Sequence, residues 1–224
     1  MQSATLGHRQ VAAQAPVGER LAFLKKVYGL LSLSVLLAAG AAWITSNNMP
    51  FASFVAQNML MFFILEIAAI FFTFWARKRE TMGLIALFSF TILTGVTTTP
   101  LLLRYTGGTV TMAAFLTGLT FAGLSLYALT TKKDLSFMGG MLRTGLILLI
   151  VGSLLNAFLF KSAWGSFGIS CVGVFLFSGF ILYDTKNIMH RYPTDEVISA
   201  TLTLYLDILN LFIFILNILG FSRD

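Results

Sequence analysis

Seven long apolar runs restrict this sequence to a narrow class of folds. Each run is about 18 or more residues long and ends at charged residues, proline or glycine, which is typical of a helix that crosses a lipid bilayer. Lipid offers the backbone no hydrogen-bond partners, so a spanning segment must satisfy its own peptide groups. The runs cover residues 27–45, 54–76, 83–103, 109–130, 142–160, 166–184 and 198–219. The sequence therefore predicts an all-α membrane protein, with a flexible N-terminal tail at residues 1–19 and one seven-helix transmembrane domain at residues 20–224.

The basic residues lie mostly at one end of these runs. If the N-terminus is cytoplasmic, all of the 15 lysines and arginines except Arg104, Lys161 and Arg223 fall in cytoplasmic segments. This follows the positive-inside rule, so the net charge of +6 indicates orientation and not nucleic-acid binding. The first run could instead be a cleaved signal peptide, because AAGAA at 38–42 offers small residues, but the later runs alternate correctly in charge only if it is a span. The single cysteine, Cys171, excludes an intrachain disulfide.

Small residues at intervals of four predict two faces for close helix packing. They are Ser34, Ala38 and Ala42 in the first run, and Ala114, Gly118 and Ala122 in the fourth. In the third run, Pro100 follows a threonine-rich stretch and cannot donate a backbone hydrogen bond. We therefore expect this stretch to face protein and not lipid.

The last run contains one carboxylate, Asp207, in the sequence LYLDILN. It lies about nine residues after Ile198, which is roughly 12–14 Å along a helix and well inside the hydrocarbon. An unpaired carboxylate there costs at least roughly 2.5–3.5 kcal/mol, so we expect Asp207 to face the bundle interior and to mark a functional site. Thr203, Asn210 and Asn217 share its helix face. This polar stripe either lines a pore or bonds helices together.

A second polar face is predicted in the run at 54–76. Glu66, Thr73 and Arg77 lie on one side of the helix. Glu66 and Arg77 are roughly 16 Å apart along the axis, so each needs a partner on another helix. Arg77 has an alternative interpretation, because it begins the sequence RKR and its side chain could extend to the lipid headgroups.

A third acidic residue, Asp184, ends the run at 166–184. The connection to the last run is short, so the two helices are antiparallel neighbours and Asp184 is expected to approach Asp207. Two carboxylates in contact cannot both ionise cheaply, so they share a proton and form a pH sensor. If Arg77 bonds the ionised pair, it latches three helices together, and protonation weakens this latch.

Four motifs spread over nearly the whole chain carry a family resemblance. They are KKVYGLLSLSVLLAAGAAW at 25–43, LSLYALTTKKDLSFMGG at 124–140, FILYDTKNI at 180–188 and ATLTLYLDILNLFIFIL at 200–216. Together they resemble the Bax inhibitor-1 or transmembrane BAX inhibitor motif family, in particular its bacterial members. The resemblance implies a bundle whose last helix is partly surrounded by the others. It also implies a pH-sensitive calcium leak gated by Asp184 and Asp207, with Arg77 as the partner of the first aspartate and Glu66 as a further family position.

Calcium is expected only as a weakly bound permeant ion, and no cofactor is expected. Calcium takes six to eight oxygen ligands, whereas Asp184, Asp207 and Asn210, even with Glu66, supply few. We therefore expect a transient calcium site at the two aspartates, which suits an ion that must leave again.

Two other functions fit part of the sequence. Some bacterial family members resemble inhibitors or substrates of a membrane-bound ATP-dependent protease, and residues 1–19 would serve as its handle. Intramembrane aspartyl proteases also place two aspartates on adjacent helices, but their second aspartate is flanked by glycine, whereas Asp207 follows Leu206. We therefore expect a multi-pass protein of the bacterial inner (plasma) membrane that is not an enzyme. Its expected partners are the bilayer, calcium and protons, with the protease as the alternative.

Overall fold

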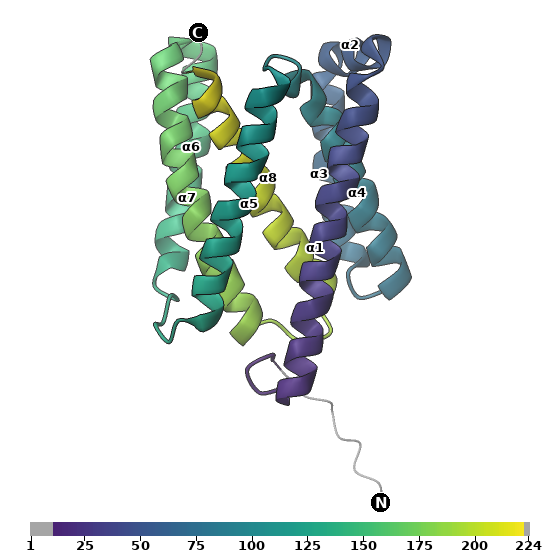
Figure 1. Cartoon of the computed structure of the whole chain (residues 1–224), viewed down its shortest axis with the longest axis vertical. Helices are drawn as coiled ribbons and strands as arrows, with labels where there is room; N and C mark the ends of the chain where they lie inside the picture. Colours follow the sequence, from purple (N-terminus) through teal and green to yellow (C-terminus); the bar gives the residue numbers. More distant parts are fainter. Residues whose placement is uncertain (1–10, 222–224) are drawn as a thin grey trace, which may run out of the picture.

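A computed structural model describes residues 11–221 as a bundle of α-helices, with no β-strand in that range (Figure 1). The helices are α1 (Val17–Ser46), α2 (Met49–Gln57), α3 (Met59–Ala76), α4 (Glu80–Leu102), α5 (Gly107–Thr130), α6 (Met138–Leu155), the π-helical turn η1 (Asn156–Phe160), α7 (Ala163–His190) and α8 (Val197–Phe221). Seven segments are long and apolar enough to span a membrane, with α6 and η1 forming one of them. The predicted all-α, seven-span membrane fold is confirmed. The cytoplasmic position of the N-terminus stays a prediction, and we call the end of the bundle that carries residues 11–15 the inner end.

The run at 54–76 is divided, so the prediction that it forms one continuous span is wrong. The side-chain amide of Asn58 donates to the Phe54 carbonyl at 2.8 Å and closes α2, after which α3 begins. At the other end of α2, the Asn48 side chain accepts the Phe51 N–H at 3.2 Å. Hydrogen bonds from asparagine side chains to the backbone compete with a continuous helix. The short α2 therefore lies apart from the long axis of α3, at the upper right in Figure 1.

Part of the predicted flexible tail packs against the bundle. The helix α1 begins at Val17, earlier than expected. Before it, Ala12 is fully buried, and its N–H donates to the Tyr192 carbonyl at 2.8 Å in the connection between α7 and α8. The predicted tail boundary at residue 19 is therefore too far along the chain. Residues 1–10 of that tail lie outside the described residues.

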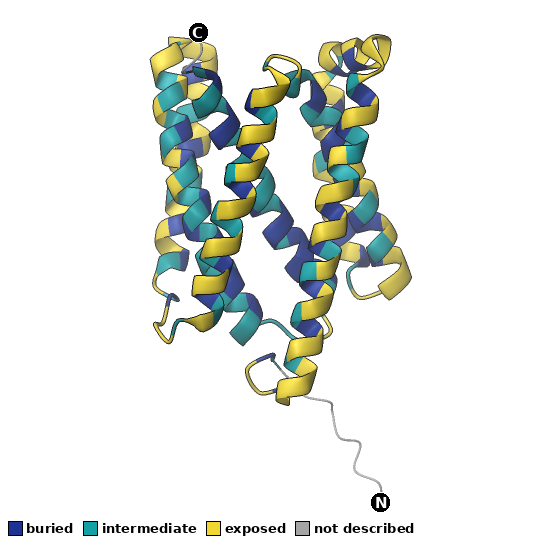
Figure 2. Cartoon of the chain, viewed as in Figure 1, coloured by how far each residue is buried: buried dark blue, intermediate teal, exposed yellow. Residues whose placement is uncertain are grey.

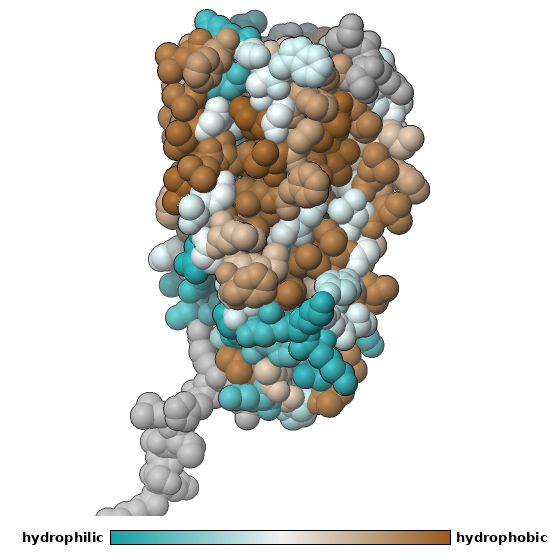
Figure 3. Space-filling model, turned by 90° about the vertical axis from the view of Figure 1, so that its left-hand side faces the viewer, coloured by the Kyte–Doolittle hydropathy of each residue, from teal (hydrophilic) through white to brown (hydrophobic). Residues whose placement is uncertain are grey.

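The last helix, α8, is the innermost one. It contacts α1, α3, α4, α5 and α7 and crosses the bundle obliquely between them (Figure 1). Figure 2 shows buried positions along most of its length. The buried residues of α8 include Leu204, Leu211 and Leu216. The outer helices present apolar side chains outward instead, and Figure 3 shows the resulting apolar belt above a hydrophilic band at the inner end. The expectation of a surrounded last helix is confirmed.

The helices α1 and α4 approach each other closely at Gly95. A Cβ atom there would lie 2.9 Å from the Cα and from the carbonyl carbon of Ala38, closer than side-chain carbons pack. Ser34 and Ala42 are buried one turn to either side, so the small-residue face of α1 packs as predicted. The threonine-rich stretch that follows Gly95 also faces protein, since Thr99 is fully buried.

The predicted packing face on α5 is wrong. Its three small residues are all exposed: Ala114, Gly118 and Ala122. The helix packs instead through Ala113 and Thr117, one residue earlier in each turn. Both faces carry small residues, and packing depends on which face meets a neighbour.

Candidate functional site

Two aspartates from the antiparallel neighbours α7 and α8 meet near the inner end of the bundle. The side chains of Asp184 and Asp207 hydrogen-bond to each other. A hydrogen bond between two carboxyl groups requires a proton on one of them. Asp207 is 5% exposed, whereas Asp184 is half-buried and lies near the Asn187 side chain. The structure brings together the two residues that the short connection between these helices indicated.

The Asp207 carboxyl is buried beside Asp184. Its Oδ2 atom is buried, and no hydroxyl, amide or cationic donor of residues 11–221 reaches it. A buried carboxylate without donors is costly. That the pair shares a proton and responds to its removal stays a prediction.

A cavity of about 320 Å³ at the inner end of the bundle reaches Asp184. Its lining residues are Tyr183, Asp184, Asn187, Arg191, Tyr192, Pro193 and Glu196. Asp207 is not among them, so it lies behind Asp184 as seen from the cavity. A proton or cation that enters from this side meets Asp184 first.

Tyr192 ties together three elements beside the aspartate pair. Its hydroxyl lies 3.2 Å from Thr203 Oγ1 on α8, and its carbonyl accepts the Ala12 N–H. Burial raises the pKa of the Tyr192 hydroxyl, and the negative charge of the nearby Asp184 raises it further. The hydroxyl therefore stays protonated and can keep its bond to α8. Sequence reasoning missed this residue, because a tyrosine in a connecting loop gives no signal of what it packs against.

Arg77 is not brought to the aspartates. It caps the C-terminal end of α3, and its guanidinium carbon lies 6.0 Å from the centroid of the Phe74 ring. Within residues 11–221 it forms no ion pair. Its predicted role as a latch would apply to a state in which the aspartates are ionised, and it stays a prediction.

Glu66 has the partner on another helix that its position requires. Thr97 Oγ1 on α4 donates to Glu66 Oε1 and also contacts the Thr94 carbonyl at 3.2 Å. The Thr94 hydroxyl in turn hydrogen-bonds to the hydroxyl of Tyr205 on α8. These contacts form a polar chain from α3 through α4 to α8, and the chain ends two residues before Asp207.

Two members of this chain, Thr97 and Tyr205, were not predicted. The threonine-rich stretch was expected to face protein, and this signal could have identified Thr97 as a partner for Glu66. Tyr205 is 2% exposed, and its ring packs edge-on against Phe90 at a centroid distance of 5.9 Å. A tyrosine in an apolar run can face either lipid or the bundle interior, so the sequence did not show that Tyr205 is buried.

The other predicted polar residues differ in their partners. Thr73 is fully buried, and its hydroxyl donates to the Ala69 carbonyl of its own helix at 2.8 Å. Asn210 likewise donates to its own helix, whereas Asn217 accepts a hydrogen bond from the Tyr105 hydroxyl at 2.9 Å. Asn217 therefore joins α8 to the connection between α4 and α5. Whether these residues also line a pore stays a prediction.

The acidic residues do not form a preorganised metal site. No group of three or more His, Cys, Asp or Glu side chains that could hold a metal ion occurs among the described residues. Two carboxyls offer fewer oxygens than a stably bound calcium ion requires. Any cation at this pair would depend on water for the rest of its ligands.

Comparisons with known proteins agree with the motifs. The family model described as "Inhibitor of apoptosis-promoting Bax1" matches residues 20–224. The chain is 38% identical to a membrane protein of Vibrio cholerae, over 90% of each chain. It is 35% identical to the modulator of FtsH protease YccA of Escherichia coli, over 90% of this chain and 91% of YccA. It is 33% identical to protein lifeguard 4 of Mus musculus, over 92% of this chain and 88% of the mouse protein.

The names of the family and of these relatives describe an inhibitor, a modulator and a membrane protein, and none of them describes an enzyme. The bacterial relatives agree with the expected inner membrane. With seven spans and a family match over most of its length, the chain belongs to the Bax inhibitor-1 family of multi-pass membrane proteins.

Proposed function

We propose that this protein is a pH-sensitive calcium leak whose gate is the hydrogen-bonded pair of Asp184 and Asp207. The observation that carries the proposal is the contact between two carboxyls, one of them buried, at the end of a cavity that opens to the inner end of the bundle. A structural role alone would be served better by neutral hydrogen-bonding side chains, which cost less to bury.

The gate works through competition between a proton and a divalent cation. With one shared proton, the pair is bonded and holds α7 against α8. When the proton leaves, two adjacent carboxylates repel each other in a medium of low dielectric constant and attract a divalent cation. Calcium replaces the proton only transiently, because the pair supplies few of its ligands.

Polar side chains continue beyond the pair in the direction that a permeant ion would take. On α8 these are Asn210 and Asn217, and beside them lies the chain of Glu66, Thr97 and Tyr205. Arg77 is proposed to bond the ionised pair as a latch, which would require α3 to move relative to α7.

The test is calcium influx into liposomes that contain the purified protein and a calcium-sensitive dye, measured from about pH 5 to about pH 8. Asp184→Asn and Asp207→Asn keep the side-chain shape but remove one titrating carboxyl. We expect the pH midpoint of the flux to shift or disappear in both variants, and Arg77→Ala to change the flux of the ionised state only. Glu80→Gln is the matched control, because it removes an exposed carboxylate from the first turn of α4.

Flux that is absent in the wild type, or identical in all variants, would contradict the proposal that Asp184 and Asp207 form a gate. The aspartates would then serve only to bond α7 to α8.

A second candidate function is that of a non-catalytic modulator of a membrane-bound ATP-dependent protease. It is favoured by the name of the Escherichia coli relative, a modulator of FtsH protease. The structure sharpens the deletion that separates the two functions. Removing residues 1–10 spares the packed segment at residues 11–15, so loss of protease binding with unchanged flux would assign the tail to the protease.

A further inference from the structure

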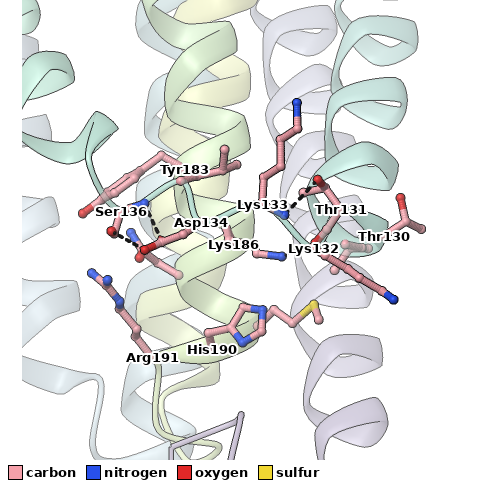
Figure 4. A pocket seen from close by; sticks show the side chains of 14 residues that line it. Thr130, Thr131, Lys132, Lys133, Asp134, Ser136, Tyr183, Lys186, His190 and Arg191 are labelled. Carbon is pink, nitrogen blue, oxygen red and sulfur yellow. Dashed lines mark hydrogen bonds between the residues drawn. The ribbon is translucent and has the colours of Figure 1, made fainter.

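A second cavity, of about 550 Å³, lies beside the first at the inner end of the bundle (Figure 4). It is formed by the connection between α5 and α6 and by the C-terminal end of α7. Four of its lining side chains are positively charged at neutral pH: Lys132, Lys133, Lys186 and Arg191. In Figure 4, Arg191 lies on the side of Asp134, Lys132 and Lys133 lie on the other side, and Lys186 and His190 lie between them.

The positive charge of this cavity is not neutralised from within. None of the four cations forms an ion pair within residues 11–221. Lys186 donates to the Thr131 carbonyl at the end of α5, which fixes its position without cancelling its charge. The one acidic lining residue, Asp134, accepts the Ser136 N–H at 2.8 Å and the Ser136 hydroxyl at 2.9 Å. These bonds lower the pKa of Asp134, so it stays ionised, and within the lining of this cavity one negative charge faces four positive charges.

The cavity also holds a buried polar atom without a partner. His190 Nε2 is buried and has no hydrogen-bond partner among the described residues. Imidazole nitrogen can donate to a phosphate oxygen, as can the hydroxyl of Thr131, which lines the same cavity and accepts the Lys133 N–H at 3.3 Å. Cationic and neutral donors therefore converge on one space that a tetrahedral anion would fit.

The cavity borders the surface that faces lipid. Phe137 in the α5–α6 connection is 73% exposed, and Met141 at the start of α6 is 62% exposed. Exposed apolar side chains at this depth mark the boundary between acyl chains and headgroups. The cavity is thus within reach both of a lipid headgroup and of the aqueous phase.

We propose that this cavity binds a phosphate group, carried by the headgroup of an anionic lipid or by a soluble phosphate compound. Positively charged residues at the inner ends of helices also set orientation, but orientation requires only charge near the membrane. It requires neither a cavity nor an unpaired imidazole nitrogen. A binding site depends on particular side chains, whereas an orientation signal depends on their number.

The test measures binding by isothermal titration calorimetry to the full chain in phosphatidylcholine nanodiscs. The probes are inorganic phosphate and the soluble short-chain lipid dihexanoylphosphatidylglycerol, with dihexanoylphosphatidylcholine as the neutral lipid. Lys132→Gln with Lys133→Gln removes two charges from the cavity. Lys25→Gln with Lys26→Gln removes the same charge from exposed positions of α1 outside it. We expect roughly tenfold or greater weakening in the cavity variant and at most about twofold weakening in the α1 variant.

A further variant separates a specific site from general attraction. His190→Phe removes the unpaired Nε2 donor, and we expect severalfold weaker binding, which His190→Gln should partly restore. Binding of both probes in competition supports a phosphate site open to either source. Binding of only the lipid, or only inorganic phosphate, supports the site and identifies the source. Absence of binding to the wild type, or equal weakening in the cavity and α1 variants, would overturn the proposal.

Discussion

The contact between Gly95 on α4 and Ala38 on α1 predicts the effect of adding a single methyl group. In Gly95→Ala, the new Cβ would lie 2.9 Å from the Ala38 Cα and carbonyl carbon. Carbon atoms without a bond between them prefer about 3.5–4.0 Å, and the Ala38 carbonyl oxygen would lie nearer still, so the helices must separate by about 1 Å or more. The obstacle is backbone, which cannot rotate away as the end of a side chain can.

The expected cost follows from two opposing terms. Overpacking a close contact costs about 1–3 kcal/mol, whereas replacing glycine by alanine within a helix returns up to about 1 kcal/mol. We expect Gly95→Ala to lower the free energy of unfolding by about 1–2 kcal/mol. For a chain of this size, that corresponds to a fall in the midpoint temperature of roughly 2–8 °C.

Gly118→Ala is the matched control, because a Cβ at this exposed helical position meets no atom within 4 Å. It receives the helical gain without the clash, so it should melt at or slightly above the wild-type temperature. Both variants can be followed in one detergent by the reaction of a thiol-specific dye with Cys171, the single cysteine of the chain. If Gly95→Ala melts as high as Gly118→Ala, the close approach of α1 and α4 is not the constraint described above.

Three further predictions concern the polar contacts. A double-mutant cycle with Thr94→Val and Tyr205→Phe should give a coupling energy of about 0.6–1.7 kcal/mol, the range for hydrogen bonds between membrane helices, and a value near zero would contradict the bond. Tyr192→Phe keeps the ring but removes the hydrogen bond to Thr203 on α8. We expect more calcium flux at a given pH, with a melting temperature within about 2 °C of the wild type. Unchanged flux would contradict a role of this bond in holding the gate closed. Asp134→Asn should speed hydrogen exchange at the Ser136 amide at pH 7. The pKa of Asp134 is lower in the folded protein than its ordinary value of 3.8, so the stabilising bond to Ser136 is present above pH 3.8. The bond is lost as the pH falls through the folded pKa, and only in that acidic range should the wild type lose the protection of the Ser136 amide.

The sequence predicted what depends on hydrophobicity, charge and short connections. The seven spans follow from apolar runs, and the approach of Asp184 to Asp207 follows from the short turn between two antiparallel helices. The interior position of Asp207 follows from the cost of exposing a carboxylate to lipid.

The remaining features depend on contacts between distant parts of the chain. The division at Asn58 arises from a local side-chain bond that an apolar run conceals. Gly118 and Gly95 are both small residues in helices, and only the packing shows that one meets a neighbour and the other faces outward. Tyr192 is positioned by hydrogen bonds to Ala12 in the N-terminal segment and to Thr203 on α8, which lie far apart in the sequence.

The burial of α8 has a consequence for biosynthesis. Among the helices of residues 11–221 it is the last to leave the ribosome, yet it contacts five of the others, including α1, which is made before them. Until α8 arrives, the earlier helices lack the partner that covers polar groups such as Thr94. The bundle therefore cannot reach its final packing before α8 has left the ribosome. A message that is truncated before α8 would yield an open bundle with exposed polar groups in lipid, which is a natural target for membrane quality control.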